Sequence, residues 1–165
     1  MEGRDLTDLF RGREDALEGF YQQIKSIADD YKLPYSKRSM TYNSRLAQEL
    51  AAWADTQDNG EVLHKKLYEA YFVENQNISE VPILLGLVED AGLDVEKAQQ
   101  VLSQRLFSQE IDQHWHRAQS MGLSGVPTFV CDELYVVGHQ QYEVLMRFLN
   151  HMRQLKLEAG NEFKS

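Results

Sequence analysis

The chain has 165 residues, a length that fits one domain with its own core, or a small domain with an appendage. Its 26 acidic and 17 basic residues give a net charge of −9, and no basic stripe is present, so nucleic acid is not an expected partner. No apolar run approaches the ~20 residues that cross a bilayer, and the N-terminal sequence MEGRDLTDLFRGRED has no apolar signal core, so we expect a cytoplasmic protein without a membrane span.

Most of the chain is predicted to be helical. Residues 1–12 are polar and contain two glycines, so we expect a lead-in segment with at most one short turn. Apolar residues then recur at intervals of three and four, the spacing of one helix face. This spacing predicts helices over about 13–32, from Asn43 to the turn at Asp58, and over 61–72, 79–92, 94–106 and 108–122.

Polar and special residues mark the ends of these helices. Asn43 and Ser79 are predicted N-caps, and Pro82 fits the first turn of its helix. Gly92 and Gly122 are predicted to end theirs. The buried faces are expected to include the aromatic residues Phe20, Tyr21, Tyr31, Trp53 and Trp115.

The pattern changes after Gly125. The runs PTFVC and LYVV are rich in β-branched and aromatic residues, and Asp132-Glu133 separates them, which predicts a tight hairpin. Neither run alternates with polar residues, so we expect both faces of the hairpin to be covered. A last helix over about 140–157 is predicted to bury Tyr142, Leu145, Phe148, Leu149 and Met152, and residues 159–165 are predicted to be a frayed tail.

The order of these segments resembles a known family. The sequence GVPTFV, a second strand and then VVGHQQYEVL resemble the C-terminal half of a DsbA-like thioredoxin fold, in the FrnE-like subgroup related to 2-hydroxychromene-2-carboxylate isomerases. The segments SKRSMTYNSRLAQELAAWA, LYEAYFVENQNISE and LLGLVEDAGLD resemble the helical insertion of that subgroup. The resemblance implies an α/β thioredoxin-like fold that is mostly helical, in which a helical insertion domain is followed by a β-hairpin and a C-terminal helix. Its parts would be the lead-in 1–12, the insertion 13–121, the C-terminal thioredoxin part 122–158 and the tail 159–165.

The resemblance also implies what this sequence does not contain. In the family, a strand, a Cys-x-x-Cys turn, a helix and a second strand precede the insertion, whereas the only cysteine here is Cys131. We therefore expect an incomplete thioredoxin sheet and no catalytic dithiol in these residues. His139 and Gln141 also stand where the subgroup usually has a small residue and a proline.

The candidate site is the loop of Gly125, Val126, Pro127 and Thr128. In thioredoxin folds the corresponding proline is cis, and the backbone before it pairs with extended substrates, so the resemblance implies a substrate-docking loop. The alternative is that the loop only shapes the entry into the strand. Asn43, His139 and Gln140 are possible cleft contacts, although simple helix capping explains each of them.

Cys131 and two histidines are weaker candidates for a reactive or metal-binding site. Cys131 ends an apolar strand and is interpreted as a small core residue with an unreactive thiol. His114 and His116 lie two apart on one helix and so point in different directions, which disfavours a metal site. We expect no metal and no cofactor. The one alternative is glutathione, which the resemblance to the related isomerases leaves possible.

The function implied by the resemblance is thiol–disulfide exchange with protein or peptide substrates, without dithiol oxidase activity in this chain. The alternatives are a non-enzymatic module that binds a peptide or subunit, and a glutathione-dependent isomerase or transferase. An open apolar strand over Pro127–Cys131 would favour association. We therefore expect a homodimer in which this strand pairs with its symmetry mate.

Overall fold

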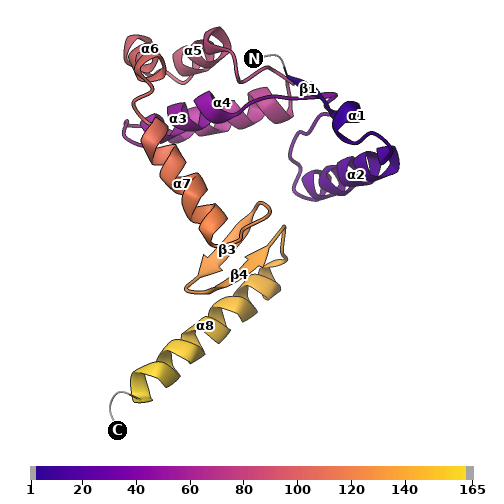
Figure 1. The fold of residues 1–165 in the computed structure, drawn as a ribbon, viewed down its shortest axis with the longest axis vertical. Helices are drawn as coiled ribbons and strands as arrows, with labels where there is room; N and C mark the ends of the chain where they lie inside the picture. The colour runs from indigo at the N-terminus through magenta and orange to yellow at the C-terminus, as the bar shows by residue number, and fades with distance from the viewer. Residues whose placement is uncertain (1–2, 163–165) are drawn as a thin grey trace. The chain divides into compact units, whose positions relative to one another are not determined.

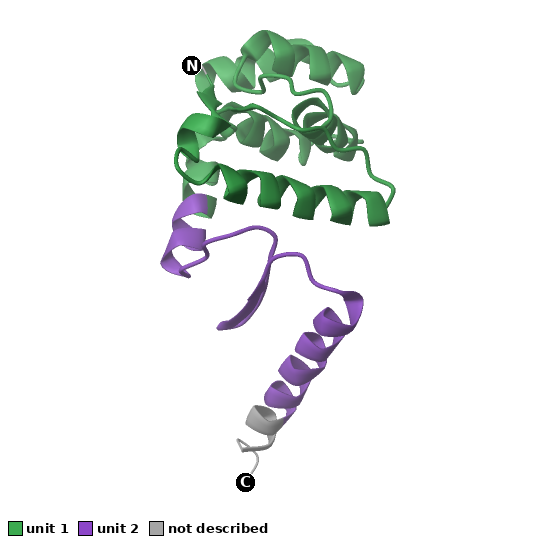
Figure 2. Ribbon diagram, turned by 90° about the vertical axis from the view of Figure 1, so that its right-hand side faces the viewer, with its two compact units in different colours: residues 1–114 green, residues 115–165 purple. Residues whose placement is uncertain are grey.

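The computed structural model describes residues 3–162, and the side chains of residues 3–157. The chain divides into two compact units, residues 1–114 and 115–165, which are coloured separately in Figure 2. The boundary falls inside a helix, and each unit is described by itself below. Within residues 3–162, none of the helices is both long and apolar enough to cross a lipid bilayer.

The first unit is helical apart from one small sheet (Figure 1). Its elements are β1 (Arg4–Asp5), α1 (Leu6–Leu9), α2 (Glu14–Asp30), β2 (Met40–Thr41), α3 (Arg45–Ala54), α4 (Glu61–Phe72), α5 (Val81–Asp90), α6 (Val95–Gln104) and the first half of α7 (Ser108–Ser120). The helices that begin at residues 61 and 108 start where the sequence predicts, because the 3.6-residue apolar period is strong there.

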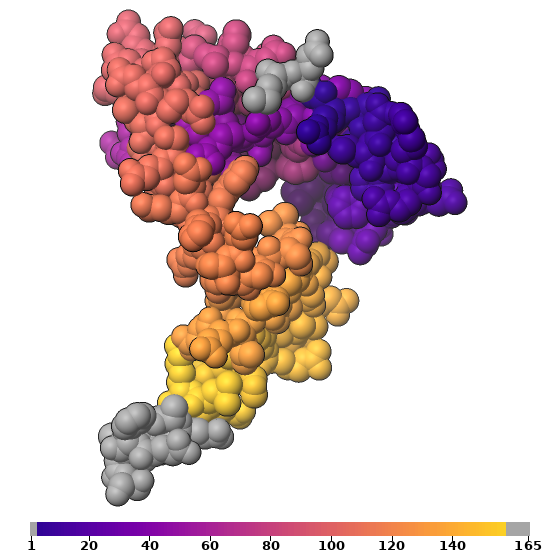
Figure 3. All heavy atoms as spheres, in the orientation of Figure 1, coloured from indigo at the N-terminus to yellow at the C-terminus, as the bar shows by residue number. Residues whose placement is uncertain are grey.

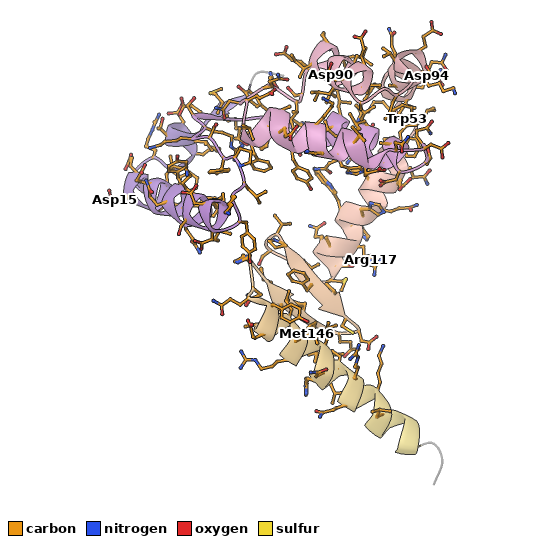
Figure 4. The ribbon with its side chains drawn as sticks, turned by 180° about the vertical axis from the view of Figure 1, so that it is seen from behind. Asp15, Trp53, Asp90, Asp94, Arg117 and Met146 are labelled. Atoms are coloured by element: carbon orange, nitrogen blue, oxygen red, sulfur yellow. The ribbon has the colours of Figure 1, made fainter. Side chains whose placement is uncertain are left out.

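The core of this unit lies among α3, α4, α5 and α6. Helix α3 packs on α4 and α6, and α5 packs on the same two helices. Figure 4 labels Trp53 on α3, among the side chains that fill the core. The core consists of Ala47, Leu50, Trp53, Ala54, Leu63, Leu67, Ala70, Ile78, Leu84, Leu87, Val88, Ala98, Val101 and Leu102.

Helix ends follow the sequence signals in part. Asp94 is the N-cap of α6 and accepts a hydrogen bond from the Lys97 N–H at 3.0 Å. Gly92 and Gly122 have φ of 72° and 67°, the left-handed conformation that ends a helix. The prediction of Ser79 as an N-cap was wrong, because α5 begins one residue later, with Glu80 at the cap, and the Ser79 hydroxyl donates to the Asn77 Oδ1 instead.

Gly60 is required by a close approach between α3 and α4. A Cβ atom on Gly60 would lie 1.8 Å from the Ala54 carbonyl oxygen. Because no side chain fits in that space, only glycine allows the chain to turn from α3 into α4 at this point.

A small sheet replaces part of the predicted lead-in segment. Strands β1 and β2 are antiparallel, with Arg4 opposite Thr41 and Asp5 opposite Met40. Asp5 then caps α1 by accepting a hydrogen bond from the Thr7 N–H at 2.7 Å. Two polar residues give no alternating pattern, which is why the sequence does not predict β1.

Several aromatic residues that were predicted to be buried are exposed. The side chains of Phe20 on α2, of Tyr31 just after α2 and of Trp115 on α7 are more than half exposed. Ala28 is the one buried residue of α2. The predictions for Phe20, Tyr31 and Trp115 were wrong because helical spacing identifies an apolar face, but not whether another element covers it.

The second unit contains a hairpin and the C-terminal helix. Strands β3 (Thr128–Cys131) and β4 (Leu134–Val137) pair antiparallel, from Thr128 opposite Val137 to Cys131 opposite Leu134. The two-residue turn Asp132-Glu133 lies where the sequence predicts, and Asp132 adopts the positive φ, 52°, that such turns require. Helix α8 (Tyr142–Glu162) starts two residues later than predicted and passes the expected end at Leu157. Of the predicted tail, residues 163–165 lie outside the described part of the chain.

The hairpin is open on both faces, contrary to the sequence prediction. Phe129 and Leu134 on one face, and Val130, Tyr135 and Val137 on the other, are each more than a third exposed. Apolar runs normally belong to central strands, but here the described residues supply only a two-stranded sheet.

Helix α8 also buries less than its sequence predicts. Tyr142 and Leu149 are exposed, so the prediction that they are buried was wrong. Among residues 115–157, only Met152 is buried. The second unit therefore exposes apolar surface on both faces of its hairpin and along α8.

Candidate functional site

The loop Gly125–Thr128 enters β3 directly, and short hydrogen bonds fix its shape. The Thr128 hydroxyl donates to the Gly125 carbonyl oxygen at 2.6 Å, and the Gly138 N–H donates to the Pro127 carbonyl oxygen at 2.8 Å. The Val126–Pro127 peptide bond is cis. The loop is thus held at both ends by the strand pair that it precedes.

Gly125 lies close to β4. A Cβ atom on Gly125 would come within 3.2 Å of Val137 Cγ1, which is tighter than ordinary contact. A side chain at this position would require the Val137 side chain to move by a few tenths of an ångström.

Val126 projects from the loop into solvent. Its side chain is 93% exposed, the highest value among the large apolar residues of the described chain, and Pro127 beside it is exposed as well. An apolar side chain in this position adds little to the stability of the unit, because it removes almost no apolar surface from water. It is available to contact another molecule.

The hairpin register shows which backbone groups are free. In an antiparallel pair, residues alternate between those that exchange hydrogen bonds across the ladder and those whose N–H and C=O point outward. The 2.8 Å bond from Gly138 to Pro127 fixes this alternation, so Phe129 and Cys131 bond to β4. Thr128 and Val130 therefore direct their N–H and C=O groups to the outer edge of β3. In the part of the chain that the structure describes, β4 is the only strand paired with β3.

His139 and Gln140 follow the hairpin and precede α8. The Gln140 side chain donates to the Val137 carbonyl oxygen at 2.9 Å, which ties this segment to the end of β4. His139 is exposed. Both residues lie in the same unit as the Gly125–Thr128 loop, whereas α8 itself begins at Tyr142.

Asn43 lies in the first unit and is not part of this loop. Its Oδ1 atom accepts a hydrogen bond from the Arg45 N–H at 2.9 Å, just before α3 begins. The N-cap of α3 is Ser44, one residue later than predicted, but the Asn43 side chain still satisfies one of the free N–H groups of the first turn.

The remaining candidates are Cys131 and two histidines of α7. Cys131 is half-buried at the end of β3. His114 and His116 are exposed on α7, and residues 3–157 contain no group of three or more His, Cys, Asp or Glu side chains placed to hold a metal ion. Figure 4 labels Arg117 on the same helix.

The first unit also contains an ion network around one buried carboxylate, which the sequence did not predict. Glu49 is fully buried on α3 and accepts hydrogen bonds from Arg45, at 2.7 Å, and from Arg105, at 2.8 and 2.6 Å. Arg45 also donates to the Ser108 carbonyl oxygen and pairs with Asp112, both at 2.7 Å. The hydrogen bonds from Arg105, the largest cause, hold the pKa of Glu49 below its ordinary range. The i,i+4 spacing of Arg45 and Glu49 is visible in the sequence, but Arg105 is 56 residues away.

Comparison with known proteins gives a consistent result. The family model for the DSBA-like thioredoxin domain matches residues 8–150. The structure of a probable DsbA oxidoreductase from Streptomyces coelicolor superimposes with a TM-score of 0.79 and 25% identity, over 93% of this chain and 69% of that one.

Two curated proteins are similar in sequence. YwbO of Bacillus subtilis is 26% identical over 67% of this chain and 56% of its own length. The ClpXP adapter protein SpxH of Halalkalibacterium halodurans is 31% identical over 57% of this chain and 33% of its own length. The chain thus spans about half of the first relative and a third of the second.

Proposed function

Because the chain belongs to the DsbA-like thioredoxin domain family, we propose that it docks extended segments of protein thiol or disulfide substrates along the Gly125–Thr128 loop and β3. The observation that carries the proposal is the open outer edge of β3, at which Thr128 and Val130 present free N–H and C=O groups beside the exposed Val126. A guest strand that pairs with this edge satisfies those groups, which is the general basis of peptide recognition by strand addition.

The side chains of the hairpin support the same use. The Thr128 and Val130 side chains lie on one face of the hairpin with Tyr135 and Val137, and three of these four residues are exposed. A guest strand continues the pleat of the sheet, so alternate apolar residues of the guest would extend this face. The preferred guest is therefore an unfolded or extended segment that has apolar residues at every second position.

We propose that these 165 residues have little or no dithiol oxidase activity. Dithiol–disulfide exchange requires a pair of cysteines, and the nucleophile must be an accessible, activated thiolate. The sequence contains only Cys131, which is half-buried at the end of β3. The chain would thus supply substrate binding, while the dithiol would come from another polypeptide segment or another protein.

An insulin-reduction assay with dithiothreitol tests this part of the proposal. We expect the wild-type chain and Cys131→Ser to leave the rate of insulin precipitation at the uncatalysed value. Catalysed reduction that disappears in Cys131→Ser would contradict the proposal and assign a redox role to Cys131.

A second candidate function is a non-enzymatic adapter. It is favoured by the relative SpxH, whose name is ClpXP adapter protein. The same strand edge would serve, because binding a segment of another protein requires no thiol chemistry. The two functions differ in whether binding depends on cysteines in the bound segment. A substrate-docking site should prefer cysteine-containing segments that form mixed disulfides with a supplied dithiol partner. An adapter should bind equally well when those cysteines are replaced by serine.

We also propose that the free chain forms a homodimer by pairing its β3 edges. A two-stranded apolar hairpin with an unpaired edge is marginally stable in water and prone to association. The twofold pairing of β3 with its mate would satisfy Thr128 and Val130 in both copies. The second copy and a substrate segment would then compete for one edge.

A further inference from the structure

The segment before β2 carries two adjacent cations that separate two pockets of the first unit. Lys37 and Arg38 belong to the wall of both pockets. One pocket, of about 90 Å³, is lined mainly by apolar side chains in or directly after α1 and α2, including Phe10, Leu17 and Phe20. The other, of about 130 Å³, has a mixed polar and apolar lining that includes Ser39, Tyr42 and Asn75. Figure 3 shows the atoms of α1 and α2 in indigo on one side of the first unit.

The two cations are not equally neutralised. The Lys37 Nζ lies 2.5 Å from the Glu18 Oε2, so its charge is compensated. The Arg38 guanidinium instead stacks on aromatic rings, with its Cζ 4.1 Å from the Tyr71 centroid and 5.2 Å from that of Phe72. Within residues 3–157, no carboxylate pairs with Arg38, and its Nη1 atom is buried without an acceptor.

An arginine in this state is suited to bind an anion. Its guanidinium is planar, carries only N–H donors and has no acceptor atom of its own. A buried charged donor without an acceptor is unfavourable, and the planar guanidinium matches the geometry of both carboxylates and phosphates. Because Lys37 is already paired with Glu18, the singly charged carboxylate is the better match here. The neighbouring pocket would hold the apolar body of the same molecule, because its lining is mainly apolar and contains no carboxylate that would repel the anion.

We propose that these adjoining pockets bind a small organic monocarboxylate, with its apolar body against Phe10, Leu17 and Phe20 and its carboxylate at Arg38. A single negative charge fits, because one of the two cations is already paired with Glu18. This binding site lies in the first unit and is independent of the strand edge at which we place substrate docking.

The test is a titration of the ¹⁵N-labelled chain with 3-phenylpropionate, followed by NMR. We expect saturable shifts at residues 6–21 and 35–42, with a dissociation constant on the order of 1 mM, as suits so few ligand atoms. The uncharged 3-phenylpropanamide and the body-less acetate should each bind much more weakly. Saturation by the amide with the same affinity, or no saturable shift at all with 3-phenylpropionate, would overturn the proposal.

Matched variants assign the two halves of the site. Arg38→Gln and Phe20→Ala should each weaken binding by about tenfold, equivalent to 1.4 kcal/mol. Arg11→Gln, which removes an exposed cation, and Leu33→Ala, which removes an apolar side chain that is 60% exposed and outside the pocket, should leave binding unchanged. Phe20 is itself 56% exposed, so its truncation should not unfold the chain. If circular dichroism shows that Arg38→Gln is unfolded, Phe20→Ala becomes the deciding variant. Unchanged affinity for 3-phenylpropionate in Phe20→Ala would then refute the site.

Discussion

Arg105 and Glu49 form a two-pronged ion pair across the helical unit, with Nε 2.8 Å from Oε2 and Nη2 2.6 Å from Oε1. Arg105 occupies the left-handed residue that ends α6, at φ 54°, and Glu49 is fully buried on α3. Parallel hydrogen bonds of this kind combine charge with fixed geometry. The pair therefore joins the end of α6 to the middle of α3.

Glu49→Gln should destabilise the chain by about 2–3 kcal/mol, because it leaves Arg105 and Arg45 without their counter-charge. The loss is smaller than for a fully buried pair, since the Arg105 side chain is about half exposed and water screens its charge. The free energy of unfolding from urea denaturation, followed by circular dichroism, measures this loss. Glu89→Gln, at an exposed position on α5, is the control and should change stability by less than about 0.5 kcal/mol. Equal stability of both variants would show that the network contributes nothing.

The same carboxylate predicts how stability depends on pH. The pKa of Glu49 is lowered in the folded chain, so the unfolded state binds the proton more tightly. The stabilisation from Glu49 is complete above its ordinary pKa of about 4.3 and is lost as the pH falls through the lower folded-state value. Urea midpoints measured between pH 7 and pH 3 should fall more steeply for the wild type than for Glu49→Gln. Parallel curves would contradict this assignment.

Gly60→Ala and Gly86→Ala should change stability in opposite directions. At Gly60 the new methyl group would overlap the Ala54 carbonyl oxygen, and we expect a loss of about 2 kcal/mol or more. Gly86 lies inside α5 with nothing within 4 Å of the added atom, so alanine there should stabilise the chain by about 0.5–1 kcal/mol through helix propensity. Thermal or urea unfolding of the two variants measures both changes in stability. A Gly60→Ala variant as stable as the wild type would show that α3 and α4 can move apart at this point without loss of stability.

The sequence predicts the elements of this fold better than their environment. Helix α4 begins and ends where its apolar period does, and the hairpin turn falls on Asp132 and Glu133. Exposure is a different matter: Val130 and Tyr135 belong to runs typical of covered strands, yet both are more than 40% exposed. Burial depends on what lies opposite, and a local pattern contains no information about that.

The candidate site shows the same division. The loop Gly125–Thr128 could be identified from its sequence, because the resemblance rests on those residues. That Thr128 and Val130 direct their backbone outward follows only from the observed register. The pockets beside Arg38 could not be predicted either, because they bring together residues of α1, α2 and the segment before β2.

The strand edge predicts a pair of proline variants with different effects on association. Val130 and Tyr135 lie opposite each other at a position where both N–H groups point away from the ladder, so proline at either removes no bond between β3 and β4. Val130→Pro blocks the outer edge of β3, whereas Tyr135→Pro blocks that of β4. By light scattering at micromolar concentration, we expect dimers for the wild type and Tyr135→Pro, and monomers for Val130→Pro. A monodisperse wild-type monomer would refute the dimer.

Amide hydrogen exchange at β3 tests strand docking most directly, with carboxymethylated insulin B chain as the extended guest. In dilute free chain, the Thr128 and Val130 amides should exchange quickly, while those of Phe129 and Cys131 are protected by β4. Saturating insulin B chain should slow exchange at Thr128 and Val130 and leave Tyr135 and Val137 unchanged. Unaltered exchange at Thr128 and Val130, or new protection on β4 instead, would contradict docking at the outer edge of β3.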